Sequence, residues 1–397
     1  MRLLYLTRGC NIHDLRFLRA FVDHGWTAGF ASLSQPTTGE SVRALPHAVH
    51  DFGCLGLGPS PSTDELLAVA PVFQQRAAEF LPEIVLAGPV HDGAFVAANA
   101  GLQCRWIAQS WAFDVLWESE RDANALRRAR SALQTCQAVL ADSRAVIRKC
   151  EVIAAGRINN RFLLPWGIDL VSTKPAKSRS TVRAEFGLEH QTVFLCTRRL
   201  EPVYRIDILL EAFRTLRAAG HNVVLLLASD GSLKPGFEAW IFGNELTDSI
   251  KLLGALEHHH LLDLFASADF YVSSAESDGT SVAMLEAMYL GVIPIVSDVG
   301  GNPEWVQHRT NGWLAQSGNA ADFARAMNEA LRMSETHRHD VTKRNHDLIC
   351  TRADWALNIG RLLPDLMQFS GLSSAGQSVH AVPSQPEVVQ LREEEGP

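Results

Sequence analysis

The sequence predicts an α/β protein with two doubly wound domains, each built on a parallel β-sheet covered by helices. Three observations lead to this prediction. Short apolar runs alternate with helix-like segments, the same alternation starts again past the middle of the chain, and a segment rich in Pro, Ser and Lys separates the two series. The length of 397 residues also favours two domains, because it exceeds what one ordinary hydrophobic core holds.

The first series of predicted strands lies in the N-terminal half of the chain. Its members are LLYLT at 3–7, EIVLA at 83–87, WIAQ at 106–109 and QAVLA at 137–141. Each run is rich in β-forming residues and is followed by a helix-like segment. This alternation is typical of a parallel sheet, because parallel strands need a crossover connection between them. We therefore expect residues 1–172 to form a first domain.

The second series follows a hinge that we place near residues 170–182, inside the irregular segment 165–187. Its predicted strands are VFLCT at 193–197, VVLLLA at 223–228, FYVS at 270–273 and VIPIVS at 292–297. Residues 173–352 are accordingly expected to form a second domain. The segment 369–397 has few large apolar residues and a cluster of acids, so we predict a disordered tail there.

Composition and charge narrow the class of partner. The chain is 47% apolar and 20% charged, as globular proteins are, and its net charge of −8 disfavours a general nucleic-acid or anionic-membrane binder. Seven cysteines without a CxxC pair, and a start without the apolar stretch of a signal peptide, predict a cytoplasmic protein with reduced thiols. No apolar run approaches the roughly 18 residues that span a bilayer, which leaves only peripheral membrane contact open.

The stretch that follows the predicted strand 270–273 carries the strongest functional signal. A loop leads to Gly279, and a helix over 281–290 is capped by Thr280 or Ser281 and ended by a glycine. A helix N-terminus at the carboxyl end of a parallel strand offers free N–H groups to a phosphate, and Gly279 lets a ligand approach the backbone closely.

Two acids, Asp278 and Glu286, lie eight positions apart around this turn. A carboxylate on the helix accepts two hydroxyls well, so Glu286 suits a ribose diol and Asp278 a second sugar. The alternative is that Asp278 is a turn residue and Glu286 a solvated acid. The next predicted strand, 292–297, favours the functional reading, because it leads to another glycine loop at the same edge of the sheet.

The order acid, seven residues, Glu, with LEAM, VGGNPEW and NGWLA around and after it, resembles the retaining glycosyltransferases of family 4, the group 1 type with the GT-B fold. Further similar segments are PWGID at 165–169, TRRLEP at 197–202 and SDGS at 229–232. The resemblance runs from residue 1 to about 368 and is strongest over 197–315. The usual family motif is Glu-x7-Glu, and Asp278 replaces its first acid.

The resemblance implies two Rossmann-like domains that face a central cleft, with residues 353–368 forming a helix that returns to the first domain. It also implies that Glu286 binds the donor ribose and Asp278 the transferred sugar. The backbone from Gly279 through Thr280 to Ser281 would hold donor phosphates and sugar, and that of Gly9 would contact phosphate.

Arginines after the predicted strand 193–197 are candidates for neutralising a leaving diphosphate. Arg198 and Arg199 are adjacent there, and the sequence leaves open which one faces the phosphates. The family pairs this arginine with a lysine about five residues later, where Tyr204 stands in this chain. Arg205 is a candidate substitute for the missing charge.

The first domain supplies candidates for the acceptor side of the cleft. Trp111 stands where many family members carry a histidine, and Asp114 matches a common aspartate of the family. Trp111 either stacks on a sugar or belongs to the core, and His13 either lines the cleft or starts the first helix. His91, in a glycine-containing loop after the strand 83–87, is a further cleft candidate.

These features together predict a retaining glycosyltransferase that moves a sugar from a nucleotide-diphosphate donor to a hydroxyl acceptor. No metal or other cofactor is expected, since the consecutive histidines 258–260 point about 100° apart on a helix and do not converge on one ion. Two alternatives remain open: an accessory subunit that binds nucleotide sugars without transfer, and another GT-B enzyme such as a nucleotide-sugar epimerase.

Overall fold

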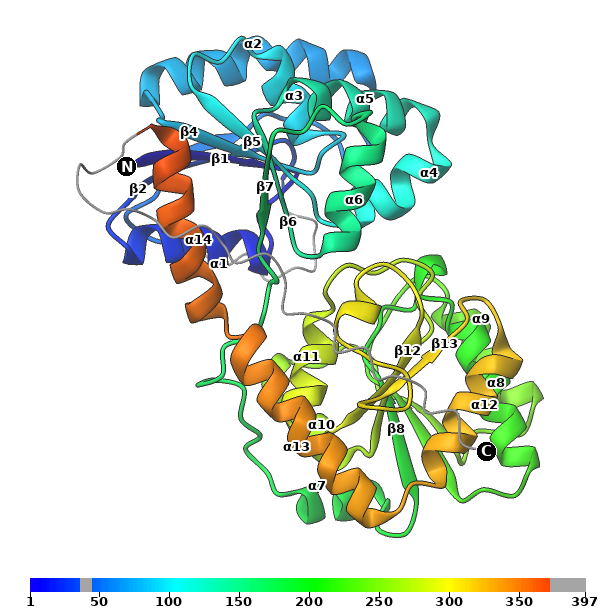
Figure 1. Ribbon diagram of the computed structural model, residues 1–397. Coiled ribbons are helices and arrows are strands. Elements are labelled where there is room, and N and C mark those ends of the chain that lie inside the picture. The colour runs from blue at the N-terminus through cyan, green and yellow to red at the C-terminus, as the bar shows by residue number, and fades with distance from the viewer. Residues whose placement is uncertain (36–44, 372–397) are drawn as a thin grey trace, which may run out of the picture.

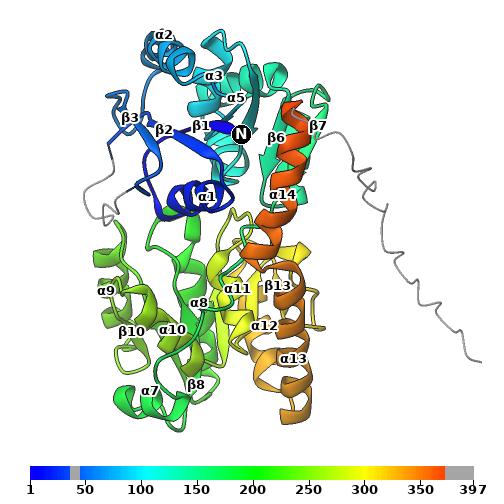
Figure 2. The same ribbon diagram turned by 90° about the vertical axis from the view of Figure 1, so that its left-hand side faces the viewer.

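A computed structural model describes residues 1–35 and 45–371 of the chain. The described residues form two α/β domains stacked end to end, each with helices on both faces of a parallel sheet (Figures 1 and 2). Most of the tail predicted at 369–397 lies outside the described residues. Its first two residues, however, belong to the last helix, which ends at Ser370.

The first domain holds a seven-stranded sheet in the order β3-β2-β1-β4-β5-β6-β7. All neighbouring strands run parallel. The strands are β1 Arg2–Thr7, β2 Thr27–Ser32, β3 His50–Cys54, β4 Ile84–Ala87, β5 Arg105–Gln109, β6 Ala138–Ala141 and β7 Asn160–Leu163. The helices are α1 Ile12–Asp23, α2 Thr63–Phe80, α3 Gly93–Asn99, the π-helix η1 Asp114–Glu118, α4 Ser119–Arg121, α5 Ala123–Thr135 and α6 Arg144–Ile153.

The second domain holds a six-stranded parallel sheet in the order β10-β9-β8-β11-β12-β13. The strands are β8 Thr192–Cys196, β9 Val223–Leu227, β10 Ile250–Leu252, β11 Phe270–Ser273, β12 Ile293–Ser297 and β13 Trp313–Ala315. The helices are α7 Arg179–Phe186, η2 Pro202–Tyr204, α8 Ile206–Ala218, α9 Lys234–Gly243, α10 His258–Ser267, α11 Val282–Tyr289, η3 Asn302–Glu304, α12 Ala320–Leu331 and α13 Glu335–Arg352.

The structure confirms all eight predicted strands, and it adds β2, β3, β7, β10 and β13. The strands that the sequence did not reveal lack a long apolar run. β10 and β13 have three residues each, and the edge strands β3 (HDFGC) and β7 (NRFL) are largely exposed or half-buried. Short or half-exposed strands give too weak a periodic signal to separate them from loops.

The chain crosses between the domains twice, and the two crossings pair with each other. The N–H of Ile168 donates to Ala353 O over 2.7 Å, and the N–H of Trp355 donates to Ile168 O over 3.0 Å. Gly167 has φ +60°, and a Cβ there would overlap the carbonyl of Ala353. The hinge is therefore a close pairing of two strand-like segments.

Helix α14, Trp355–Ser370, follows the second crossing and packs on the first domain (Figure 1, red). Its buried residues share one apolar cluster with strand β1 and helix α1. The members from α14 are Ile359, Leu362, Leu363, Leu366 and Phe369. The C-terminal helix thus contributes to the core of the N-terminal domain.

Each sheet has a point at which the strand order reverses direction. In the first sheet this switch point lies between β1 and β4, and in the second it lies between β8 and β11. In open α/β sheets ligands bind at the carboxyl ends of the strands at a switch point. No helix among the described residues is long and apolar enough to cross a membrane.

Candidate functional site

An arginine and an aspartate meet at the switch point of the second sheet. Arg198 follows β8, and Asp278 follows β11 after a five-residue step. The Nη2 of Arg198 donates to Oδ2 of Asp278, and its Nε donates to the Ser273 hydroxyl over 3.1 Å. The exposed fractions of the two charged side chains are only 13% and 10%.

This geometry places the two candidate arginines differently. Arg198 points to Asp278, whereas the side chain of Arg199 is 69% exposed and lies 3.8 Å from Glu201. Tyr204, which stands at the family's lysine position, lies beside the guanidinium of Arg198, with 5.5 Å between ring centroid and Cζ. Arg205 pairs instead with Asp207 at 2.9 Å.

Burial and charge set the protonation of the central pair. Burial acts to lower the pKa of Arg198, but the carboxylate of Asp278 together with Tyr271 and Tyr204 outweighs it, and the pKa is raised. Burial raises the pKa of Asp278, although the arginine opposes that rise. The switch point therefore holds the permanent positive charge of Arg198, which is paired with the carboxyl group of Asp278.

The glycine loop and helix α11 form the neighbouring part of the site. Ser281 is the N-cap, because its hydroxyl accepts the N–H of Met284 over 3.2 Å. The N–H of Thr280 is taken by the first domain: it donates to Oδ2 of Asp142 over 2.6 Å, and the Thr280 hydroxyl donates to the Asp142 carbonyl over 2.9 Å. A Cβ at Gly279 would overlap the Asp142 carboxylate.

The contact between the domains is reciprocal. While Asp142 meets the N-terminus of α11, Glu304 of the second domain accepts the N–H groups of Arg144 and Ala145 at the N-terminus of α6, over 3.2 and 2.9 Å. Carboxylates are stabilised at helix N-termini. Burial nevertheless raises the pKa of Asp142 to about 7, against the hydrogen bond from Thr280. Sequence reasoning did not find Asp142 or Glu304, since each is an ordinary helix-start acid in its own domain.

Glu286 lies on α11 and is buried, with 7% of its surface exposed. Its Oε1 lies 2.7 Å from Nε2 of His258, the first residue of α10. The prediction that the histidines 258–260 begin a helix is confirmed, but the contact of His258 with Glu286 was missed. The rings of His259 and His260 lie 3.9 Å apart. Among residues 1–35 and 45–371, no group of three His, Cys, Asp or Glu side chains is arranged to hold a metal.

In the first domain, the structure brings His13 and Trp111 together. Their ring centroids lie 6.0 Å apart, and Trp111 also contacts Trp166 at 5.2 Å. Burial, with the charge of Arg16, lowers the pKa of His13 to about 4, so this ring is neutral. Trp111 is half-buried against the core cluster of β1 and α14.

Backbone atoms of neighbouring loops lie close to both Asp114 and Gly9. Asp114 is buried, and its carboxylate accepts the N–H of Val90 over 2.7 Å and the hydroxyl of Ser110 over 2.7 Å. It therefore joins the loops after β4 and β5 and does not face open space. Gly9 lies in the loop after β1, where the atoms nearest to a Cβ would be 3.9 Å away, in Ser34 and Gln35.

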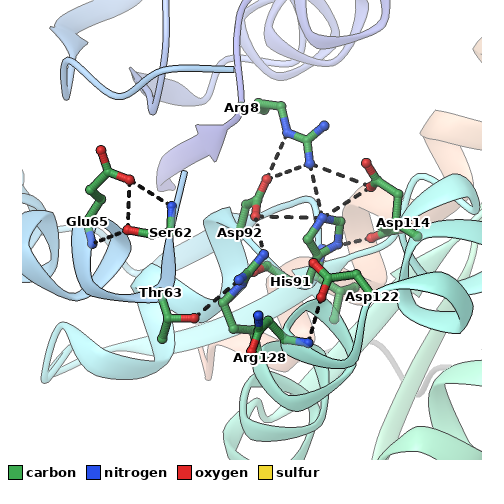
Figure 3. A network of polar contacts seen from close by, with 12 residues as sticks. Arg8, Ser62, Thr63, Glu65, His91, Asp92, Asp114, Asp122 and Arg128 are labelled. Carbon is green, nitrogen blue, oxygen red and sulfur yellow. Dashed lines mark hydrogen bonds and ion pairs between the residues drawn. The ribbon is translucent and has the colours of Figure 1, made fainter. Parts of the chain in front are cut away.

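His91 belongs to a charged network at the switch point of the first sheet (Figure 3). Arg8 donates to Asp92 through Nε and Nη2 over 2.8 and 2.5 Å, and the ring of His91 lies 3.1 Å from Glu118. The buried Arg128 approaches Asp92 from the other side, at 3.7 Å. The sequence pointed only to His91, because its partners come from segments far apart in the chain.

Comparisons with known proteins agree with this geometry. Residues 178–347 match the family model of the glycosyl transferases group 1. The amylovoran biosynthesis glycosyltransferase AmsK of Erwinia amylovora is 28% identical over 37% of this chain and 37% of its own length. A GDP-mannose-dependent mannosyltransferase of Corynebacterium glutamicum, acting on a monoacylated phosphatidylinositol monomannoside, is 29% identical over 37% of this chain and 41% of its length. The chain thus spans about two fifths of each of these relatives.

Solved structures extend the likeness to both domains. HepE of Anabaena in complex with UDP-glucose aligns with a TM-score of 0.75 at 19% identity, over 93% of this chain and all of that one. A sucrose-phosphate synthase of Thermosynechococcus elongatus gives 0.77 at 16% identity, over 94% and all of that chain. The fold is the GT-B fold, as predicted. Within it, residues 178–347 are the part that is similar to the glycosyl transferases group 1.

Proposed function

We propose that this chain is a retaining glycosyltransferase of family 4, which transfers a sugar from a nucleotide-diphosphate donor to a hydroxyl acceptor. One observation carries the proposal: the pairing of Arg198 with Asp278 at a switch point, beside the helix that carries Glu286. The group 1 match of residues 178–347 and the nucleotide-sugar complexes among the similar folds support it.

The chemistry follows from where negative charge develops. As the glycosidic bond breaks, the pair of bonding electrons leaves with the nucleotide diphosphate, and fixed positive groups stabilise that charge. Arg198 supplies a permanent guanidinium, and the N-terminus of α11 supplies N–H groups and the positive end of a helix dipole. Asp278 and Glu286 accept hydroxyls of the transferred sugar and the ribose in this scheme.

Donor binding in this scheme competes with a contact inside the chain. The N–H of Thr280 already donates to the buried carboxylate of Asp142. A donor oxygen that takes this N–H must displace Asp142, which requires the domains to move apart at that contact. Loading of the donor and opening of the domains are thus coupled.

Retention and metal independence belong to the proposal as well. The arginine and helix end meet the leaving charge without a bound cation, so turnover is expected to be unchanged by EDTA. Loss of turnover in EDTA that returns with Mg²⁺ would overturn this part. A cytoplasmic location remains a prediction.

The deciding experiment is a thermal-shift screen of nucleotide sugars followed by product analysis. A ligand at 100 times its Kd stabilises the native state by about 2.7 kcal/mol, which a melting curve detects. Slow hydrolysis of the stabilising donor, followed by NMR at early times, is expected to release the sugar with its anomeric configuration kept. Binding without bond cleavage would favour the accessory subunit, and a changed ring stereocentre would favour an epimerase.

A further inference from the structure

The switch point of the first sheet opens into a cavity of about 480 Å³. The cavity lies at the carboxyl ends of β1 and β4 and is covered by the segment that joins η1, α4 and α5. Its volume falls in the range of about 300–1,000 Å³ that small-molecule sites occupy. Of its wall, only His91 was singled out from the sequence.

The floor of this cavity is charged and buried. Asp92 is 2% exposed at its side chain and lies between Arg8 and Arg128 (Figure 3). The Nε of Arg128 donates to the carbonyl of His91 over 2.9 Å, which fixes the loop that carries both His91 and Asp92. Buried charges cost free energy unless they are paired, and such clusters concentrate at functional sites.

Above that floor, two groups of opposite charge reach the open space. The side chains of Arg8 and Glu118 are 33% and 27% exposed, and their charged atoms lie 3.6 Å apart. Burial lowers the pKa of His91, but the hydrogen bond with Glu118 and the charge of Asp92 outweigh it and raise that pKa. A guanidinium donor beside a carboxylate acceptor matches neighbouring hydroxyls, which both donate and accept.

The charges of the wall are balanced. Its arginines are Arg8, Arg121 and Arg128, and its carboxylates are Asp92, Glu118 and Asp122. Arg121, the arginine farthest from Asp92, pairs with Glu276 of the second domain at 3.1 Å. An anionic ligand would have to break one of these pairs to find a free cation.

The cavity also lies beside the proposed donor site. Arg121 reaches Glu276, two residues before Asp278, and Arg8 directly precedes Gly9. The side chain of Leu116, next to the wall residue Trp117, packs against Gly300, which in turn packs against the Asp278 carbonyl. One ion pair and one side-chain contact thus join the surroundings of the cavity to the loop that carries Asp278.

We infer that this cavity binds the acceptor of the proposed transfer, and that the acceptor end it receives is a neutral polyhydroxyl group, a sugar or a polyol. Glu118 and Arg8 bind its hydroxyls, and Asp92, His91 and Arg128 hold these two side chains in place. The inference rests on the proposed function for the role of the bound molecule. The balanced charges and the cavity itself do not depend on that role.

The first test is direct binding, measured by saturation-transfer NMR with methyl α-D-glucopyranoside, methyl α-D-mannopyranoside and myo-inositol as probes. At least one neutral probe is expected to bind the wild-type chain. Glu118→Gln should weaken it by about 10-fold or more, because a hydrogen bond to a charged group is lost. Glu120→Gln is the matched control, since Glu120 lies two residues further on, in α4, but pairs with Lys149 outside the cavity wall.

A second variant keeps the inference testable if Glu118→Gln does not fold. Ser60 is exposed on a loop at the cavity wall, so Ser60→Trp fills the space without touching the core. It should abolish binding of the neutral probe and leave the melting temperature unchanged. Wild-type binding of myo-inositol 1-phosphate or of phosphatidylinositol vesicles at least 10-fold tighter than of every neutral probe would overturn the assignment to a neutral acceptor. Unchanged probe binding in Ser60→Trp would overturn the site.

The same variants separate this inference from the proposed function. The nucleotide sugar found by the thermal-shift screen should bind Glu118→Gln and Ser60→Trp with wild-type affinity. If the wild-type chain binds neutral probes in the cavity but no nucleotide sugar, the proposed function fails and the polyhydroxyl site stands. If it binds a nucleotide sugar but no neutral probe, the inference fails and the proposed function stands.

Discussion

The two switch points of this molecule carry the same pair of residues. In each sheet an arginine follows the strand at the switch, and an aspartate lies five residues beyond the neighbouring strand: Arg8 with Asp92, and Arg198 with Asp278. The neighbours differ. Arg198 and Asp278 stand beside the N-terminus of α11, whereas Arg8 and Asp92 stand in a cavity with further charges of both signs.

The comparison shows that topology fixes where a site lies, while the surrounding groups decide which ligand it suits. At the second switch point the N-terminus of α11 adds N–H groups and the positive end of a helix dipole to the charge of Arg198, and this combination suits a diphosphate. Arg8, in contrast, lies between two carboxylates, Asp92 and Glu118, and this arrangement of a donor beside acceptors suits hydroxyls. The proposed transfer is therefore divided between a donor edge in the second domain, at Arg198 and Asp278, and an acceptor edge in the first, at Arg8 and Asp92.

The largest effect is expected at Arg198. Arg198→Ala should lower kcat by about 10²–10³, the scale for losing one preorganised donor to developing charge. It should also lower the melting temperature, because Asp278 stays buried without its counter-charge. Arg199→Ala is the control and should retain nearly full kcat, since its side chain is 69% exposed. Full activity in Arg198→Ala would contradict the assignment of the donor diphosphate to Arg198.

A pH effect is expected at the contact between the two domains that Asp142 and Thr280 form. The pKa of Asp142 is raised to about 7 by burial, from an ordinary value of 3.8. Its contribution to domain closure is therefore complete below about pH 3.8 and is lost as pH rises through about 7, because the ionised carboxylate is costly to bury. Small-angle X-ray scattering should show the radius of gyration rising between pH 3.8 and about 7.

Asp142→Asn is the matched variant, since it keeps the side-chain oxygen that accepts the Thr280 N–H but has no charge to bury. Its radius of gyration should stay constant over the same range. If wild-type chain and variant respond alike, the pH effect belongs to another group, and Asp278, whose charge faces Asp142, is the first to examine.

A smaller effect is expected at His258. Its Nε2 lies 2.7 Å from Glu286, and one hydrogen bond is worth about 1 kcal/mol, so His258→Ala should weaken donor binding about 3- to 10-fold. His259→Ala serves as the control, and calorimetric titration with the donor measures both. Equal affinity in the two variants would mean that His258 does not orient the carboxylate.

The smallest effect is expected from removal of residues 372–397. This segment has few large apolar side chains, so its deletion should leave melting temperature and turnover nearly unchanged. Deletion from residue 355 onward is the contrasting variant, because it removes the five apolar side chains that α14 buries against the first domain. A marked loss in the shorter deletion would show that the tail packs.

The donor edge was easier to predict from the sequence than the acceptor edge, for a physical reason. The strand, glycine turn and capped helix around Asp278 and Glu286 are local, so sequence order alone indicates the arrangement. The network of Arg8, Asp92 and Glu118 forms only when the strands of the first sheet bring the loops after β1, β4 and β5 together, and Asp142 meets Thr280 only when two domains close. No single stretch of sequence carries such a signal.

The division between the two edges is tested most directly by one calorimetric experiment. The nucleotide sugar selected by the thermal-shift screen is titrated into the wild-type chain, Glu286→Ala and Glu118→Gln. Our account predicts that its affinity falls at least about 10-fold in Glu286→Ala, where a charged hydrogen-bond partner is lost, and stays at the wild-type value in Glu118→Gln. Unchanged affinity in Glu286→Ala, or its loss in Glu118→Gln, would contradict the account.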